Sequence, residues 1–410
     1  MVTPSLLSVL RPEVNRRLHE FYDQLRAEGP CYWDRTLRAW VVTGYAEVSQ
    51  AAGDPRLSSV RYPDIDKVPA ELKPLAVVLG RQMLYSDAPD HPRLRRLVAK
   101  AFTARTLARL EQQIAGTIDA IIDRARPTGQ LDIVADLAVP LPIAVICDQL
   151  QVPHADRAQL TAWSNEVAHV IGNSRLTAAE NAAGSASMDR MLDYFRGLIA
   201  EHAARDADTP LAGFVRARAA GEELSEDELL ANCVILLIGG HETTTHFLGS
   251  AMLNLLRHPE QLRLLTERPE LIDSAVEELL RYDSAVQLML RRPLEDMELG
   301  GHEMAAGQAV LLVGGAANRD PAVFTDPHAL DITRAGPRHV AFGHGPHFCI
   351  GAGLARLESR LTLRALTTQL PGLRLATDAV DWLPSLNFRG LRSLPVEFDA
   401  GVASARPGVR

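Results

Sequence analysis

Apolar residues spaced three and four apart run through the middle and the end of this 410-residue chain. That spacing gathers apolar side chains on one face of an α-helix. It predicts helices over six segments: 94–110, 114–126, 188–204, 228–257, 269–282 and 350–370. Shorter runs at 37–43, 297–299, 309–313, 373–376 and 394–398 predict strands, with the second and third joined as a hairpin across a Gly300-Gly301 turn. We therefore expect a mainly α protein with a small β-rich portion.

The domain organisation is expected to be simple. No long polar linker interrupts the chain, so residues 1–400 are predicted to form one domain and residues 401–410 a flexible tail. Residues 60–92 hold five prolines and little periodicity. Such a stretch is typical of a lid over a site or of a plain surface loop.

Composition and charge exclude several classes of protein. The net charge of −8 gives a nucleic-acid partner no electrostatic support. The longest apolar run, 233–240, is too short to span a bilayer, and the first ten residues lack a signal-peptide pattern. The four cysteines are scattered without a Cys-x-x-Cys spacing, which fits reduced thiols. We expect a cytoplasmic monomer that binds neither nucleic acid nor membrane.

One cysteine stands in an unusual segment. Residues 342–351 read FGHGPHFCIG, and the glycines permit unusual backbone angles and the close approach of a flat ligand. A predicted helix begins at once, so Cys349 lies at a helix N-terminus, where the dipole and the free amides favour a thiolate. A thiolate is a suitable ligand for iron. The alternative is a structural cysteine buried in a turn.

The longest predicted helix breaks local rules in its middle. It begins at a capping box formed by Ser225 and Glu228, and at 239–245 it reads GGHETTT. Each glycine inside a helix costs about 1 kcal/mol relative to alanine, and a buried glutamate is costly unless it is paired. A break of this kind indicates a functional site, although paired glycines also occur where two helices cross closely.

A zinc site is the chemical alternative for the same stretch. His241-Glu242 begins like the HExxH helix of zinc hydrolases, whose second histidine follows four residues after the first. Here Thr245 occupies that position, and His246 is one residue further, about 140° around the helix from His241. The two histidines are therefore not expected to face one metal.

The cysteine segment resembles the haem loop of the cytochrome P-450 superfamily. That loop reads Phe, two residues, Gly, three residues, Cys, one residue and Gly, which Phe342, Gly345, Cys349 and Gly351 match. The resemblance covers nearly the whole chain and favours the soluble actinobacterial members that tailor natural products. It implies a helical prism with a long central helix over haem b, iron ligation by Cys349, and contacts of Phe342 and Gly351 with the cofactor.

The break in the long helix resembles the oxygen-binding segment of the same superfamily. That segment reads Ala/Gly-Gly-x-Asp/Glu-Thr, which Gly239, Gly240, Glu242 and Thr243 match. By this resemblance the glycines would lie over the haem and leave room for dioxygen. Thr243 would hold the activated oxygen by a hydrogen bond, and Glu242 would supply protons.

The resemblance also assigns charged residues. Four of them would bind the two haem propionates, since cationic and donor groups match carboxylates: His91, Arg95, Arg291 and His347. Glu278 and Arg281, three residues apart on one predicted helix, would join Arg334 in a buried structural network.

The implied function is the insertion of one oxygen atom of O2 into a hydrophobic secondary metabolite, by hydroxylation or epoxidation. Apolar and polar walls of the substrate pocket are expected at six positions: Ile235, Ile238, Val286, Gln287, Leu386 and Asn387. An oxidative coupling or cyclisation enzyme of the same fold is the alternative. A non-catalytic haem protein that binds a ligand is a more distant one.

Electrons would come from NAD(P)H through external redox proteins, because no flavin or nicotinamide fingerprint is present. Arg356, Arg360 and Arg364 recur every four residues on the helix after the cysteine. They predict a cationic stripe that docks an acidic ferredoxin. The alternative is a solvated helix face.

Overall fold

The computed structural model describes residues 4–99, 102–173, 176–202, 211–213, 218 and 224–400, so the predicted tail lies outside the described residues. Helices account for most of what is described: α1 (Pro12–Arg16), α2 (Leu18–Ala27), α3 (Tyr45–Gly53), α4 (Lys73–Leu79), α5 (Asp90–Ala99), α6 (Ala104–Ala125), α7 (Pro140–Gln149), α8 (Arg157–Gly172), α9 (Ala178–His202), α11 (Glu226–Arg257), α12 (Pro259–Glu267), α13 (Ile272–Tyr282), α14 (Gly314–Ala317) and α15 (Ala352–Gln369). The expected mainly α architecture is confirmed.

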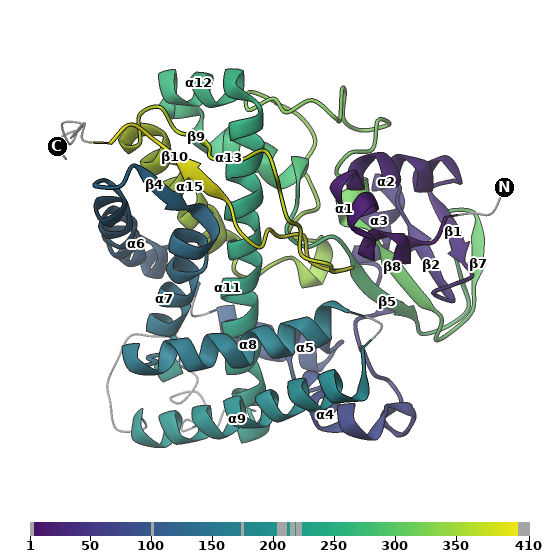
Figure 1. The fold of residues 1–410 in the computed structure, drawn as a ribbon. Coiled ribbons are helices and arrows are strands. Elements are labelled where there is room, and N and C mark those ends of the chain that lie inside the picture. The colour runs from purple at the N-terminus through teal and green to yellow at the C-terminus, as the bar shows by residue number, and fades with distance from the viewer. Residues whose placement is uncertain are drawn as a thin grey trace.

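The strands form a five-stranded, a three-stranded and a two-stranded sheet. In the first, the order is β1 (Cys31–Asp34), β2 (Ala39–Val42), β8 (Ala309–Leu312), β5 (Met289–Pro293) and β3 (Leu57–Ser58). The second is β4 (Gln130–Asp132), β10 (Pro395–Glu397) and β9 (Arg374–Leu375), and the third pairs β6 (Met297–Leu299) with β7 (His302–Met304). Figure 1 shows the largest sheet beside α1 to α3, on the opposite side of α11 from α6 and α7.

The long helix α11 passes through the centre of the molecule (Figure 1). Its predicted capping box is present, with Ser225 and Glu228 bonded to each other's backbone amides. Its first half packs into a hydrophobic cluster with α4, α8 and α9, and its last half into another with α6, α13 and α15. Residues 239–246 belong to neither cluster. The stretch with the two glycines therefore lies at the junction between the two hydrophobic cores.

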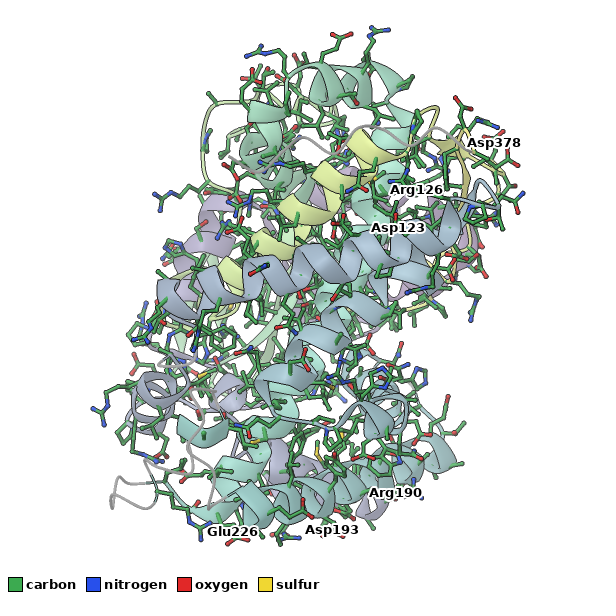
Figure 2. The ribbon with its side chains drawn as sticks, turned by 90° about the vertical axis from the view of Figure 1, so that its left-hand side faces the viewer. Asp123, Arg126, Arg190, Asp193, Glu226 and Asp378 are labelled. Carbon is green, nitrogen blue, oxygen red and sulfur yellow. The ribbon has the colours of Figure 1, made fainter. Side chains whose placement is uncertain are left out.

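The second of these cores is built on α6 and α15. Figure 2 shows α6, with Asp123 and Arg126 labelled near its end, lying along α15. Arg126 fastens the two helices at this end, because its Nη2 donates to the Gln369 side chain over 3.0 Å. Since α15 begins just after the cysteine loop, this packing fixes where the loop is presented.

Three local predictions differ from the structure. Segment 94–110 is two helices, α5 and α6, rather than one. Strand 297–299 pairs with His302–Met304, while 309–312 joins β2 and β5 in another sheet. The reason is that Gly300 and Gly301, at φ +59° and +77°, turn the chain back at once. Segment 60–92 is not wholly irregular, since it contains α4, where Leu75 and Leu79 are fully buried.

The described helices were also compared with the requirements for a membrane-spanning segment. None of them combines the length and the apolar character that a bilayer crossing requires.

Candidate active site

The two glycines in the middle of α11 have different structural reasons. A methyl group added to Gly240 would come within 2.9 Å of Ile146 in α7, so this glycine lets two helices cross closely. A methyl group added to Gly239 would meet nothing within 4 Å, and Gly239 is exposed although the helix before it is buried. Packing therefore explains Gly240, whereas Gly239 leaves room for a ligand.

The open face of α11 extends along one turn to Thr243. Its hydroxyl donates to the carbonyl oxygen of Gly239 over 2.8 Å, a bond that threonines in helices commonly make. Ile235, Gly239 and Thr243 follow each other at four-residue spacing and so share one face. This face of α11 therefore carries one hydroxyl group, that of Thr243, beside a glycine and an apolar side chain.

The carboxylate of Glu242 is paired, as a buried acid must be. The Nε2 atoms of His241 and His246 lie 3.5 and 3.4 Å from its two oxygens. In the amide orientation that satisfies its hydrogen bonds, the side-chain nitrogen of Asn165 in α8 donates to Oε1 over 2.5 Å. Burial raises the pKa of Glu242, and the two histidines outweigh burial and hold the pKa below its ordinary value.

Sequence reasoning did not single out His246 or Asn165 as partners of Glu242. The four-residue spacing from Glu242 to His246 was a signal for the first contact, whereas nothing local indicates the second. No group of three potential metal-ligating side chains among the described residues has metal-site geometry. Because both histidines face Glu242, the zinc alternative has no support.

The loop before α15 is closed by its own backbone. Gly343 and Gly345 adopt φ of +73° and +69°, and a methyl group on Gly345 would lie 2.7 Å from Gly53 in α3. The amide of Cys349 donates to the Phe342 carbonyl over 2.8 Å. These contacts hold the cysteine directly in front of α15, which packs on α11.

The thiol of Cys349 has a polarised environment. Its side chain is exposed, unlike those of the three other cysteines. Burial outweighs the other effects and holds its pKa above the ordinary value, although the amides of Gly351 and Ala352 and the charges of Arg95 and Arg356 act to lower it. These amides and arginines are the groups that would stabilise a thiolate once the thiol loses its proton.

Four predicted cationic or donor groups converge beside this loop. The rings of His91 and His347 lie 3.9 Å apart between centroids. Burial lowers the pKa of both, that of His347 to about 3, and the charges of Arg95 and Arg291 lower both further. Such a concentration of positive charge is unfavourable without an anion.

The anion is not supplied by the described residues alone. Asp87 is the carboxylate that acts on His91 and Arg291, and it already accepts hydrogen bonds from Ser58 and Ser59. The Nε2 atom of His91 is buried without a hydrogen-bond partner in the described part of the chain. The cluster therefore fits a ligand with two negative charges.

Comparison with known proteins decides which ligand. A family model described as Cytochrome P450 matches residues 208–369. The biotin biosynthesis cytochrome P450 of Bacillus subtilis (strain 168) is 36% identical over 394 residues, which cover 96% of this chain and 99% of the relative. The chain belongs to the cytochrome P450 family.

Other similar proteins are cytochrome P450 enzymes as well. The cytochrome P450 monooxygenase PikC of Streptomyces venezuelae is 39% identical, over 94% of this chain and 92% of its own length. The solved structure of P450BioI with hexadec-9Z-enoic acid ligated acyl carrier protein has a TM-score of 0.90 at 36% identity, covering 95% of this chain and 99% of that one. The protein is a P450 monooxygenase, an oxidoreductase whose family uses haem, O2, a small substrate and a redox partner.

The residues of this P450 fit haem. The accessible thiol of Cys349 suits an iron ligand, and the open space at Gly239 would lie over the haem. The cationic and donor groups around His91, whose Nε2 has no partner in the described part of the chain, suit the two propionates. This fit rests on the geometry of the chain and is independent of the family assignment.

The carboxylate of Glu278 is the centre of a buried network in this P450. Arg281 donates to it from Nε and Nη2 over 2.7 and 2.8 Å, and the Nε of Arg334 lies 3.1 Å from both oxygens. Arg281 also donates to the carbonyls of Asn318 and Pro327. The structure thus brings the three predicted members together and ties α13 to the segment that follows α14.

The predicted pocket residues of the P450 separate into two groups. Ile235 shares a face with Thr243, and Val286 and Asn387 are half-buried, so these three stay predictions for the pocket wall. Ile238 does not share that face. It is 3% exposed and packs in the core between α7, α8 and α11, because it is offset by one residue from the four-residue row.

Gln287 and Leu386 are also directed away from the expected pocket. The Tyr22 hydroxyl donates to Gln287 Oε1 over 2.9 Å, and Gln287 Nε2 donates to the Ser284 carbonyl. Leu386 is buried in the cluster formed by the N-terminal helices. The amide of Gln287 is thus engaged in structural hydrogen bonds, and its role as a polar anchor stays a prediction.

The arginine stripe of the P450 is partly neutralised. Arg356 makes two hydrogen bonds to Glu277, over 2.6 and 2.9 Å. Arg360 lies 3.5 Å from Glu111 and 3.7 Å from a second carboxylate. Both line a groove of 570 Å³ between α6, α13 and α15. Arg364 is exposed, so the three arginines are not equivalent as a docking surface.

Proposed function

We propose that this P450 inserts one oxygen atom of O2 into a hydrophobic secondary metabolite, by hydroxylation or epoxidation. The observation that carries the proposal is the accessible thiol of Cys349 together with an open helix face that bears Thr243. A thiolate ligand and a distal hydroxyl are the groups that oxygen activation by haem requires. The name of the Streptomyces venezuelae relative, a monooxygenase, supports the reaction class.

We assign haem b as the cofactor and Cys349 as its iron ligand. Bound haem supplies a thiolate-ligated iron at which O2 is activated with two electrons. Contacts with the ring are proposed for Gly239, Gly240, Phe342 and Gly351. The propionates are proposed to be held by the cationic cluster: His91, Arg95, Arg291 and His347.

The residues of the chain would handle the protons and the substrate. Thr243 would turn its hydroxyl from the Gly239 carbonyl to the distal space and donate a hydrogen bond there. Glu242, the next residue along the helix, would return the proton that this hydroxyl passes on. Ile235 and Val286 would exclude water from the reacting carbon, and Asn387 is the remaining polar anchor.

Electrons are proposed to come from NAD(P)H through a ferredoxin and its reductase. The docking surface remains the face of α15 with Arg356, Arg360 and Arg364. Arg356 and Arg360 are paired with carboxylates, which reduces their attraction for an acidic ferredoxin, so Arg364 is proposed to contribute most to docking. We also propose that the protein works as a monomer in the cytoplasm, where its thiols stay reduced.

The test combines binding and isotope labelling. Spectral titration of the haem-loaded protein against polyketides, peptides and terpenoids finds a ligand, which is then turned over under ¹⁸O₂. One ¹⁸O atom in the product is the expected result. A product without label contradicts monooxygenation and indicates oxidative coupling or cyclisation. A ligand that binds but is never converted indicates a non-catalytic haem protein.

A further inference from the structure

The carboxylate of Glu242 is enclosed by three side chains from two helices. His241 and His246 approach it along α11, and Asn165 reaches it from α8. The side chains of Glu242, His241 and His246 are 12%, 3% and 9% exposed. Protons held in this cluster are therefore largely shielded from bulk water.

The hydrogen bonds of His241 fix where its ring protons lie. Its Nδ1 is 2.9 Å from the carbonyl oxygen of Leu237. A carbonyl oxygen only accepts, so Nδ1 carries a hydrogen, and in a neutral ring Nε2 then has a bare lone pair. Nε2 is buried, has no hydrogen-bond partner in the described part of the chain, and lies 3.5 Å from a Glu242 oxygen. In a neutral ring its lone pair would therefore face the ionised carboxylate. An attractive contact needs one additional proton, either on His241 Nε2 or on the carboxyl group.

His246 does not need an additional proton. Its Nδ1 is buried without a hydrogen-bond partner in the described part of the chain, and a methyl group on Gly390 would come within 2.0 Å of it. Its Nε2 lies 3.4 Å from the second Glu242 oxygen. The neutral ring with its hydrogen on Nε2 satisfies this geometry. Burial keeps the pKa of His246 low, which agrees with a neutral ring.

Two neutral side chains of the described residues contact the cluster from other elements. Asn165 from α8 reaches Glu242, and Phe388 from the late loop lies against the ring of His246. The charges that act on the pKa of Glu242 and of His246 come from members of the cluster itself. The additional proton is thus retained by the three side chains alone.

We propose that His241, Glu242 and His246 form a proton store beside Thr243, with one proton shared between His241 Nε2 and Glu242 Oε1. His246 and Asn165 hold the carboxylate in place. This inference rests on the proposed roles of Glu242 and Thr243. The proton would move from Nε2 to Oε1, and the protonated carboxyl group, no longer held as an anion, would turn and pass it to the Thr243 oxygen. The Thr243 hydroxyl would in turn release its own hydrogen toward the space over Gly239, where bound haem would supply the oxygen chemistry. His241 is left neutral and is reprotonated from solvent, while both electrons come from the redox partner.

The first test determines the protonation of the His241 ring by nuclear magnetic resonance of the ferrous–CO protein with ¹⁵N-labelled histidine. His241 is assigned by the signal lost in His241→Gln. The proposal predicts a ring with both nitrogens protonated near neutral pH, or else an infrared band of a protonated carboxyl group that Glu242→Gln removes. If the Nε2 of His241 is unprotonated and no such band is present, the proton store does not exist.

The second test separates storage from hydrogen bonding. Glutamine in place of His241 can still donate to Glu242 but cannot carry the additional proton. We expect His241→Gln to lower product per NADPH by about 100-fold, the lower range of what a positioned acid contributes. His246→Gln, which keeps its donor, should lower it less. Equal losses in the two variants, or no loss in His241→Gln, contradict the proposal.

The matched control is His258, the residue that follows α11, whose Nδ1 bonds to the Asn254 carbonyl of that helix over 2.7 Å. His258→Gln removes the same kind of bond away from the site and should leave coupling unchanged. All variants are first checked for the thiolate-type CO spectrum. A wild-type protein without that spectrum refutes the proposed function, whereas an intact spectrum with a fully coupled His241→Gln refutes only the proton store.

Discussion

Thr243 is the side chain on which the proposed oxygen chemistry depends most. Its hydroxyl bonds to the Gly239 carbonyl on the open face of α11. Thr243→Ala removes that hydroxyl without changing the packing of the buried side of the helix. We expect product per NADPH to fall about tenfold or more while NADPH consumption continues, because proton delivery is lost. Thr243→Ser should restore most of the yield, and a fully coupled Thr243→Ala would refute the assigned role.

Glu358 in α15 supplies a pH-dependent prediction. Both its oxygens are buried without a hydrogen-bond partner in the described structure, and burial raises its pKa from 4.5 to about 8. The folded protein therefore keeps a proton that the unfolded chain loses, and stability falls as pH rises from about 4.5 to about 8.

Glu358→Gln cannot lose this proton. As pH rises across that window, the free energy of unfolding of the variant minus that of the wild type should increase by about 1 kcal/mol for each pH unit. Urea unfolding followed by circular dichroism at several pH values measures the difference. Two parallel pH profiles would show that Glu358 does not titrate as described.

Single residues differ in how far the sequence could place them. Cys349 and the glycines of its loop follow from a contiguous motif. The resemblance assigned both His91 and His347 to the propionates, and the structure places their rings 3.9 Å apart between centroids, whereas their binding to propionates stays a prediction. Ile238 is buried in a hydrophobic cluster and the amide of Gln287 makes structural hydrogen bonds, environments that the sequence alone did not indicate. Asn165 was missed, since its contact with Glu242 arises only when α8 crosses α11.

At the scale of elements, α11 carries two glycines whose substitutions should act in opposite directions. Gly240→Ala places a methyl group 2.9 Å from Ile146 in α7 and should destabilise the protein by about 1–3 kcal/mol. Gly239→Ala meets nothing and should stabilise the helix by up to about 1 kcal/mol. Urea unfolding of both variants tests this, and equal effects would contradict the two separate reasons.

The α15 face makes a prediction about electron delivery. Arg364 is exposed, whereas Arg356 is committed to Glu277. Arg364→Glu should slow reduction by a ferredoxin up to about tenfold at low salt and flatten the salt dependence, because steering is lost. Stopped-flow reduction under CO measures the rate. Arg35→Glu, an exposed change beyond β1, is the control, and the docking proposal fails if both variants reduce alike.

At the scale of the whole molecule, the six predicted helical segments fall on α5, α6, α9, α11, α13 and α15, because each carries its own apolar spacing, whereas α7 and α8 were not predicted. The sheet was less predictable, since β2 pairs in parallel with β8 across about two thirds of the chain, and no local pattern records such a partner. The division of the interior into two hydrophobic clusters on either side of residues 239–246 was also not local information. A ligand bound beside Gly239, where an added methyl group would meet nothing within 4 Å, would account for the glycine and threonine residues at this point of α11.

The central claim is that the thiolate of Cys349 ligates haem iron. The direct measurement is the absorption spectrum of the reduced, haem-loaded protein under CO. We predict the red-shifted Soret band at the wavelength for which the family is named, and its loss in Cys349→Ser. A shorter-wavelength band in the intact protein, typical of a histidine or neutral thiol ligand, or the absence of bound haem, would contradict the account.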